Sequence, residues 1–309
     1  MSDSTAVQDS PVTVRRIPDP AEPVPAVAWP TVTLLLATAV SLGLSTWMAL
    51  AGHWPLWASV LPNAIGAYLM FTVSHDAMHG ATSNNRRLNM AIGWIATPFF
   101  APPASFPAVR FIHMQHHRFT NHEQGVDPDA YTMSGPKWQR PVRWTTVDLH
   151  YIWFYLHHAR KRPRRELVGL LAQWVIIAAL FAWAIATGHA TELLLLVLVP
   201  QRLAILWLAF AFDYLPHHGL TAKPTEDRFK TTRNRVGFER LLSPLLLYQN
   251  YHLVHHLHPV VPFYRYLRVW RKNEEQYLDH EPALSTAGGR PITPDEYREL
   301  RRLVEHDHH

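Results

Sequence analysis

Three histidine-rich segments of this chain have the composition and spacing of metal-binding sites. The segment His113–His117 has the pattern H-x-x-H-H, and His252–His256 repeats it. His75 and His79 add a pair four residues apart. Residues three and four positions apart lie on one face of a helix, with Cβ atoms roughly 5–6 Å apart, so each segment can present its imidazoles together. We therefore predict eight metal ligands: His75, His79, His113, His116, His117, His252, His255 and His256.

The ligand type limits the chemistry of such a site. The chain has no cysteine, which excludes disulfides, thiolate zinc sites, iron–sulfur clusters and haem-thiolate centres. Imidazole suits Zn, Cu, Fe and Ni, so ligand type alone does not select the metal. A structural zinc ion needs only four ligands. Hydrolytic two-zinc sites usually contain carboxylates, in which these segments are poor. Eight imidazoles therefore favour a redox site with two metal ions.

The elements that must position these histidines include four apolar stretches long enough to cross a bilayer, for which about 20 residues are needed. No Asp, Glu, Lys or Arg occurs between Pro23 and His75. A further apolar stretch, 88–107, contains four prolines and is expected to be re-entrant or interfacial. The chain is thus predicted to be an all-α integral membrane protein, with a buried hairpin of a soluble protein as the alternative. The predicted spans are 29–51, 56–74, 167–187 and 193–212.

The charge distribution predicts the orientation and the partners. The connections near residues 52 and 189 carry no Lys or Arg, whereas the other connections and both ends are basic. Cytoplasmic loops are enriched in Lys and Arg, so both termini and all three histidine segments are expected in the cytoplasm, at the cell inner or plasma membrane. The net charge of +5 indicates an anionic partner, and 12 tryptophans favour a membrane interface over nucleic acid.

The composition also divides the chain into three parts. Residues 1–27 are polar and proline-rich and are predicted to be a disordered N-terminal tail. Residues 28–280 are expected to form the membrane domain, and residues 281–309 a polar C-terminal tail.

The motifs resemble those of the membrane-bound, histidine-rich fatty acid desaturase superfamily, over roughly residues 60–270. The three histidine segments stand in that family's order and spacing. Further phrases at 127–129, 212–217 and 249–257 look closest to the bacterial β-carotene ring hydroxylase branch. The resemblance implies a four-helix transmembrane stalk with a cytoplasmic helical cap that holds an all-histidine diiron site, with O2 as co-substrate. It implies no catalytic residue beyond the metal centre.

The resemblance also implies a ninth ligand between the fourth span and the third histidine segment. His217, four residues after Asp213, matches the family phrase, and His218 is the alternative. Metal-bound imidazole usually donates its other N–H to an acceptor. The candidates for that role are Asp76, Asp127, Asp129 and Asp213. For Asp127 and Asp129, turn formation around Pro128 is an equal alternative.

Arg202 is unusual because it lies near the middle of the fourth predicted span. A cation at that depth is costly and is usually functional. Two roles are open: contact with a polar substrate group in a cavity, or pairing within the helix bundle. A hydrocarbon carotene has no group that Arg202 could bind.

Two oxidations remain as predicted functions: O2-dependent carotenoid ring hydroxylation, and desaturation of a fatty-acyl chain. Both begin with removal of a hydrogen atom from an unactivated C–H bond; return of a hydroxyl gives an alcohol, and a second removal gives a double bond. A metal transporter would place histidines within the spans rather than at their exits, which counts against transport. The sequence shows no electron-transfer module, so an external acidic carrier, ferredoxin or a cytochrome b5-type protein, is expected at the basic face.

Overall fold

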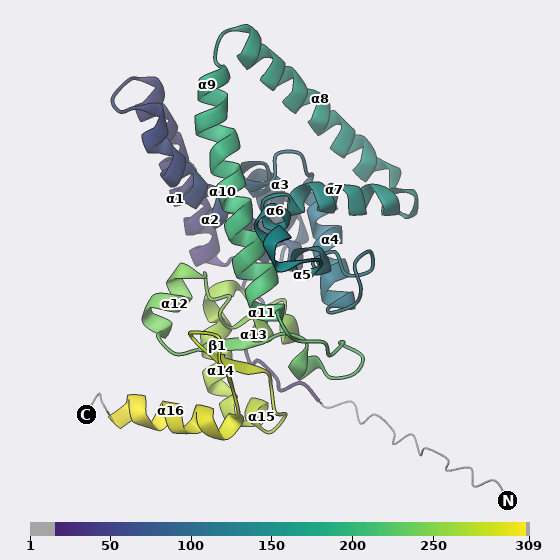
Figure 1. Ribbon diagram of the computed structural model, residues 1–309, viewed down its shortest axis with the longest axis vertical. Helices are drawn as coiled ribbons and strands as arrows, with labels where there is room; N and C mark the ends of the chain where they lie inside the picture. Colours follow the sequence, from purple (N-terminus) through teal and green to yellow (C-terminus); the bar gives the residue numbers. More distant parts are fainter. Residues whose placement is uncertain (1–15, 307–309) are drawn as a thin grey trace, which may run out of the picture.

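Four long apolar helices dominate the structure, a computed structural model that describes residues 16–306 (Figure 1). They are long and apolar enough to cross a membrane, which confirms the number of predicted spans. Their bounds are Trp29–Leu50 (α1), Leu56–His79 (η1, Leu56–Ser59, followed by α2, Val60–His79), Arg164–Ala186 (α8) and Ala190–His217 (α9 to α11).

The outer surfaces of these helices are apolar. Val40 of α1 and Val175 of α8 are both 69% exposed, and Leu170 is the one buried residue of α8. Large apolar faces of this kind are costly in water and favourable in lipid. Together with the helix lengths, they indicate a membrane protein whose spans contact the hydrocarbon directly.

The second span continues further than predicted. The sequence predicts its end at Ser74, but α2 runs on through the first histidine segment to His79. Gly80 ends the helix in the left-handed conformation (φ +73°), which a residue without Cβ adopts readily. His75 and His79 therefore lie on a continuous, rigid helix.

The fourth span contains two wider, π-helical turns. Helix α9 (Ala190–Leu193) leads into η4 (Leu194–Leu198), α10 (Val199–Leu208), η5 (Ala209–Tyr214) and α11 (Leu215–His217). The ring of a proline inside a helix clashes with the carbonyl four residues earlier. For Pro200 and Pro216 these carbonyls belong to Leu196 and Phe212, which lie in η4 and η5. The prolines thus explain both π-turns, a feature often found at functional sites.

Shorter helices surround the spans. The proline-rich stretch 88–107 forms α3, which packs along α2, and the start of α4; neither is among the four apolar spans, as predicted. The remaining helices and short helical turns are α3 (Arg86–Phe100), α4 (Phe106–Phe119), α5 (Ala130–Met133), η2 (Lys137–Gln139), α6 (Arg140–Thr145), α7 (Val147–His158), η3 (Ala159–Lys161), η6 (Arg228–Lys230), α12 (Glu239–Leu245), α13 (His252–Leu257), η7 (Phe263–Arg265), α14 (Tyr266–Lys272), α15 (Glu274–Leu278) and α16 (Pro294–His306).

A small sheet corrects the all-α prediction. Strand β1 (Asn234–Val236) pairs in parallel with β2 (Leu284–Thr286), and β2 pairs antiparallel with β3 (Pro291–Ile292). Tyr297 of α16 is buried and accepts a 2.9 Å hydrogen bond from Trp270 Nε1. The part of the predicted polar tail up to residue 306 is therefore integrated into the folded body, while 307–309 lie outside the described residues.

The predicted N-terminal tail also differs in its described part. Residues 1–15 lie outside the described residues, and 16–27 form no helix or strand. This segment is nevertheless held in place: Asn84 N donates to Pro25 O (2.9 Å), and Ala28 N donates to Thr82 O (2.7 Å). Glu22 pairs with Arg265 at 3.0 Å. The segment thus covers the exit of α2 and is not a free tail.

The tips of both helical hairpins lie at one end of the molecule, and the ends of the described chain, near residues 16 and 306, lie at the other (Figure 1). The turn between α1 and η1 and the turn between α8 and α9 form the upper end in this view. An even number of crossings follows from this arrangement, and it brings the ends of α2 and α11 to the same side.

We expect a reporter inserted after Gly188 to lie on the opposite side of the membrane from a reporter fused after His309, because residue 188 is in the turn between α8 and α9. The measurement is protease or thiol-reagent accessibility in intact and opened cells. Both reporters on one side would contradict the even number of crossings.

Candidate metal centre

All nine predicted histidines meet in one cluster, where the ends of α2, α4, α11 and α13 come together. In each of two groups, four imidazoles offer nitrogens within 4.8 Å of one another. Group A consists of His75, His79, His113 and His255, and group B of His116, His217, His252 and His256. His117 joins them, because it also lies within this distance of His255 and His256.

The nitrogen positions of group A and of His117 fit a bound cation. His79 Nε2 lies 2.8 Å from His113 Nε2, which lies 3.2 Å from His117 Nε2. His117 Nε2 lies 2.9 Å from His255 Nε2, and that atom is 3.1 Å from His75 Nε2. An imidazole nitrogen has one proton or one lone pair and makes one hydrogen bond. His113, His117 and His255 each have two such neighbours, so hydrogen bonds cannot satisfy the set.

A metal ion satisfies such a set. Nitrogens that bind one divalent ion at about 2.1 Å each lie roughly 3 Å apart, which matches these distances. In group B, the Nε2 atoms of His116 and His217 are buried without a hydrogen-bond partner, which is costly unless a cation binds them. His252 Nε2 and His256 Nε2 lie 3.1 Å apart. Both groups therefore fit a metal ion.

His217 and not His218 belongs to the cluster. His217 is fully buried, and its ring centroid lies 4.8 Å from that of His116 and 5.1 Å from that of His252. His218 is exposed and stacks on Tyr214 (4.6 Å). The π-turn η5 ends at Tyr214, and α11, which carries His217, begins at the next residue.

Burial keeps most of these imidazoles neutral, which is the form that binds metal. It lowers the pKa of His113, His117, His252, His255 and His256 well below the usual value, and the neighbouring imidazoles lower it further. Neutral nitrogens are therefore available to a metal ion at pH 7 without a cost for deprotonation.

His116 differs because it faces carboxylates. Burial opposes its charged form, but Asp129 and Asp127 outweigh this and raise the pKa of His116 to about 9. Its Nδ1 lies 2.9 Å from Asp127 Oδ1 and 3.3 Å from Asp129 Oδ2. The carboxylates hold the proton on Nδ1 and leave Nε2 directed at group B, as in carboxylate–histidine–metal arrangements.

Asp127 combines the two roles that the sequence leaves open. Besides His116, its side chain accepts hydrogen bonds from Asn121 N (2.9 Å) and Asp129 N (3.0 Å). It therefore forms the turn around Pro128 and orients His116 at the same time. Asn121 has a positive φ of 64° and anchors this loop by donating to the carbonyls of Ala222 and Thr231.

Asp76 has a different role from the predicted one. Its oxygens accept hydrogen bonds from Thr31 Oγ1 (2.8 Å) and Phe263 N (3.2 Å). The described hydrogen bonds of this carboxylate are thus to α1 and η7 and not to an imidazole. Asp76 ties α2 to α1 and to the C-terminal part of the chain.

Two acceptors behind the imidazoles were not predicted. His252 Nδ1 lies 2.6 Å from Gln249 Oε1, and His255 Nδ1 lies 2.9 Å from the Tyr266 hydroxyl. The position of Gln249, three residues before His252, is a local signal that sequence reasoning could have used. Tyr266 lies beyond the irregular 258–262 segment, and its contact depends on the fold.

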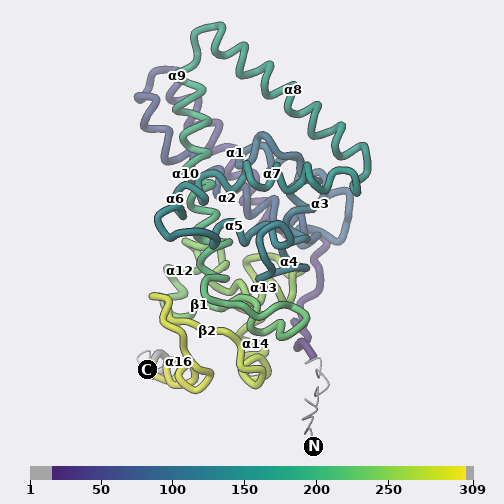
Figure 2. Tube along the Cα trace, turned by 45° about the vertical axis from the view of Figure 1, so that its right-hand side comes forward, coloured from purple at the N-terminus to yellow at the C-terminus, as the bar shows by residue number. Residues whose placement is uncertain are grey.

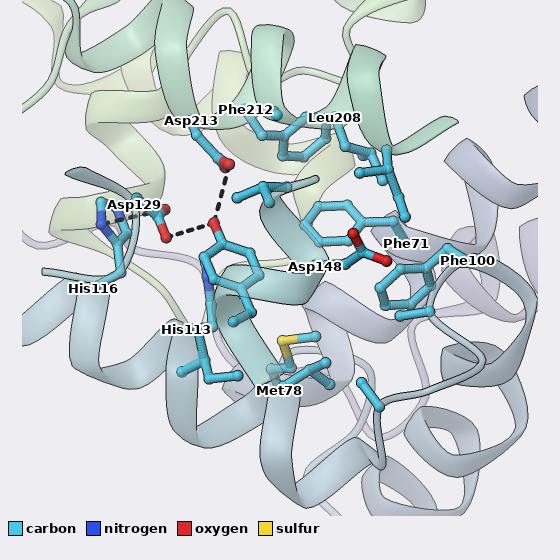
Figure 3. Close-up of a pocket in the computed structure, with 18 of the residues that line it drawn as sticks. Phe71, Met78, Phe100, His113, His116, Asp129, Asp148, Leu208, Phe212 and Asp213 are labelled. Atoms are coloured by element: carbon cyan, nitrogen blue, oxygen red, sulfur yellow. Dashed lines mark hydrogen bonds and ion pairs between the residues drawn. The ribbon is translucent and has the colours of Figure 1, made fainter. Parts of the chain in front are cut away.

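Tyr151 of α7 joins two of the predicted carboxylates, Asp129 and Asp213, which are labelled in Figure 3. Its hydroxyl lies 2.7 Å from Asp129 Oδ1 and 3.0 Å from Asp213 Oδ2. The hydroxyl has one proton and can donate to one carboxylate at a time. Burial raises the pKa of Asp129 to about 6 even though His116 opposes it. Asp213 thus reaches the cluster through Tyr151 and Asp129, and contacts no imidazole directly in the described hydrogen bonds.

An apolar cavity lies against both histidine groups. His113 of group A and His116 and His252 of group B line it. Figure 3 shows His116 and Asp129 at one side of the cavity, and Phe71, Phe100 and Asp148 at the other. The cavity is suited to a hydrocarbon segment, since most of the side chains that complete its wall are apolar, among them Met78, Ile112, Leu208 and Phe212.

The structure favours the second of the two roles considered for Arg202. Its guanidinium pairs with both carboxylate oxygens of Asp148, one at 3.0 Å, and donates to Thr145 O at 2.9 Å. Asp148, and not Arg202, is among the residues that line the cavity. Arg202 therefore joins the fourth span to the start of α7 and needs no substrate group as a partner.

Four helices that can span a membrane, nine clustered imidazoles that could bind metal and an apolar cavity are features expected of a membrane oxidoreductase. The chain belongs to the fatty acid desaturase family, whose sequence model matches residues 45–288. This confirms the predicted superfamily.

Individual relatives include carotenoid-modifying enzymes and acyl desaturases. A β-carotene ketolase of Paracoccus sp. (strain PC1) is 31% identical over 76% of this chain and 88% of the relative. A second one, of Paracoccus sp. (strain N81106 / MBIC 01143), is 30% identical over 72% and 86%. An sn-2 acyl-lipid omega-3 desaturase (ferredoxin) of Arabidopsis thaliana is 25% identical over 73% and 57%. The two carotenoid relatives are ketolases, whereas the motifs predict the ring hydroxylase branch.

We expect gently purified protein to bind two metal ions per chain, one for each four-histidine group. His217→Ala should lower the content to about one, because it removes a buried ligand of group B only. His218→Ala is the matched control and should keep both. Elemental analysis with a protein quantification gives the ratio; one ion in the wild type, or loss in the control variant alone, would contradict the assignment.

Arg202→Leu should destabilise the protein by about 1–3 kcal/mol, since it leaves the nearly buried Asp148 carboxylate unpaired. A third of the Arg202 side chain is exposed, so solvent screens its ion pair with Asp148. The loss of stability should therefore lie towards the lower end of this range. Thermal unfolding in detergent measures it, and Arg202→Leu/Asp148→Leu should recover part of the loss. A large rise in KM with unchanged stability would show instead that Arg202 contacts the substrate.

Proposed function

We propose that this protein is an O2-dependent diiron oxygenase that oxidises a C–H bond in the ring of a carotenoid. The observation that supports it most is the contact of both histidine groups with one apolar cavity. This arrangement exposes a hydrocarbon directly to two metal sites and keeps bulk water away from the reacting carbon.

In this proposal the nine histidines bind two iron ions: His75, His79, His113, His116, His117, His217, His252, His255 and His256. Bound iron supplies the capacity to activate O2 and to remove a hydrogen atom from an unactivated carbon. The chain's own residues position and insulate the site. Asp127, Gln249 and Tyr266 hold the Nδ1 protons of His116, His252 and His255, so that each Nε2 faces a metal.

The carboxylates near the cavity provide a place for the protons that the reaction consumes. Insertion of one oxygen atom requires a C–H bond, one O2, two electrons and two protons, and gives an alcohol and one water. Tyr151 and Asp129 line the cavity and lead from it to His116. These groups are close enough to hold a proton near the reacting carbon.

The products differ by the number and place of the oxidations. One insertion gives a ring hydroxyl, which is the outcome predicted from the motifs. Two insertions at the same carbon, followed by loss of water, give a ketone, as the names of the two bacterial relatives suggest. We propose ring oxygenation as the common first step, with the hydroxyl as the first product.

Fatty-acyl desaturation is the alternative, because the cavity lining suits any hydrocarbon and acyl desaturases are among the relatives. There, removal of two hydrogen atoms gives a double bond and two waters from the same O2, two electrons and two protons. The carotenoid assignment is favoured because the chain is 31% identical to the ketolase of strain PC1 and 25% identical to the Arabidopsis thaliana desaturase. The match also covers 88% of that ketolase but 57% of that desaturase.

The remaining proposals concern placement in the cell. We propose that the protein lies in the cell inner or plasma membrane with both termini and the histidine cluster on the cytoplasmic side, since basic residues gather at that end. There it would receive electrons from an external carrier, ferredoxin or a cytochrome b5-type protein; one desaturase relative has ferredoxin in its name. No nucleic-acid partner is proposed. Residues 28–280 would form the membrane domain, with 281–306 packed onto it.

Expression in cells that make β-carotene, followed by analysis of pigments and fatty acids, tests the proposal. We expect hydroxylated or ketonic carotenoids and an unchanged acyl profile. His116→Ala and His255→Ala should each abolish the product while the protein still inserts, because the spans fold by burial in lipid; His218→Ala should stay active. New acyl double bonds with unchanged pigments would establish the alternative, and activity of either ligand variant would refute the metal-site assignment.

A further inference from the structure

A second cavity approaches the histidine cluster from another side. It is polar, and its wall includes His79 of group A, Asn84, Arg86 and Arg110. Among the residues that the structure describes, no Asp or Glu lines it. The apolar cavity reaches the cluster through His113, His116 and His252, so different imidazoles face the two spaces.

The N-terminal segment and the start of α3, which hydrogen bonds hold together, form part of the wall of the polar cavity. Val24 of the N-terminal segment forms part of its wall, and Asn84 N donates to Pro25 O, which holds that segment against the start of α3. Asn89 Nδ2 donates to Asn85 O (3.1 Å) and also bonds to Ser83 O. Figure 2 shows the N-terminal segment, in purple, running along the end of the molecule away from the hairpin tips. The part of the cavity wall that this segment contributes therefore lies in the half of the molecule opposite the hairpin tips.

The rim is positively charged. Arg86, Arg87 and Arg110 are exposed, and within residues 16–306 none of them forms an ion pair. Arg110 Nε donates to Met78 O (2.7 Å), which fixes its side chain beside the end of α2. Arg86 and Arg110 line the opening, and Arg87 follows Arg86 in the first turn of α3. These unneutralised guanidinium groups together attract an acidic surface.

His79 connects this opening to the metal centre. His79 is among the residues that line the polar cavity, and its Nε2 lies 2.8 Å from His113 Nε2 within the cluster. A group docked in the opening would thus be one residue away from the proposed metal site. The hydrocarbon substrate occupies the other cavity, so both can be bound at once.

We propose that the polar cavity beside His79 is the docking and electron-entry site for an acidic one-electron carrier protein. This inference rests on the proposed function, which needs two electrons for each O2. In each transfer the reduced carrier loses one electron and the metal centre gains it, through the edge of His79. Electron-transfer contacts are small and transient, and charge complementarity chiefly raises their association rate.

Charge reversal at α3 tests the inference. Arg86→Glu/Arg87→Glu should lower the second-order rate constant of reduction by an acidic carrier about tenfold or more at low salt. Both residues lie in the first turn of α3, where Glu is favourable, so the variant should fold. The milder Arg86→Gln/Arg87→Gln should fall between it and the wild type. The matched control is Arg160→Glu/Lys161→Glu, in an exposed basic run elsewhere, which should change the rate less than about twofold.

The measurement uses iron-loaded full-length protein in lipid nanodiscs, without O2 or substrate. Stopped-flow absorbance follows the oxidation of a reduced plant-type [2Fe–2S] ferredoxin and of reduced cytochrome b5. Photoreduced riboflavin, which is small and uncharged, should reduce all variants at the wild-type rate. Binding of vesicles that contain anionic phosphatidylglycerol should be equal for the α3 variant and the control.

The outcomes separate this inference from the proposed function. A wild type that binds no iron refutes both. A wild type that riboflavin reduces but neither carrier reduces, or an equal or larger effect of the 160–161 control, refutes the docking site and leaves the proposed function intact. Unchanged carrier rates with a selective loss of vesicle binding would show that the opening binds lipid headgroups instead.

Discussion

The structure depends on one constraint: nine imidazoles must be held against one another inside a largely apolar protein. Nitrogens of seven of them approach to 2.8–3.2 Å, and three of these face two neighbours although each can make one hydrogen bond. A cation between them would relieve this crowding. The helices that carry the ligands must therefore be rigid without it, and burial in lipid supplies that rigidity independently of the site. The long apolar spans and the crowded polar cluster are two consequences of the same requirement.

The carboxylates are arranged to support this cluster without joining it. Asp127 and Asp129 face the Nδ1 side of His116, and Asp213 is connected to them only through Tyr151. Negative charge is thus concentrated behind group B, while group A has a hydroxyl, Tyr266, behind His255. The two proposed metal sites consequently have different electrostatic surroundings. This asymmetry would give the two proposed ions different preferred charges, although their ligands are all imidazoles.

Local spacing was sufficient to predict the histidine segments and the number of spans, because helical periodicity and hydrocarbon thickness act over short stretches of chain. The ninth imidazole, His217, was predicted only from the resemblance to a known family. Contacts across the fold were not predictable in this way. Tyr151 lies 22 residues from Asp129 and 62 from Asp213, and Arg202 meets Asp148 across 54 residues. No periodicity links such partners. The π-turns were also missed, although Pro200 and Pro216 were visible, since a proline alone does not show whether a helix kinks, ends or widens.

The small sheet has a consequence for the order in which the protein matures. Asn234 of β1 accepts a 3.0 Å hydrogen bond from Leu253 N, at the start of the third histidine segment, and β1 is itself paired with β2 at residues 284–286. During synthesis, β2 leaves the ribosome well after the histidines that it helps to position. The four spans can therefore be in the bilayer while the third segment still lacks its support. Under the proposed function, we expect metal insertion to follow the synthesis of β2 and to act on a protein whose four spans are already in the membrane.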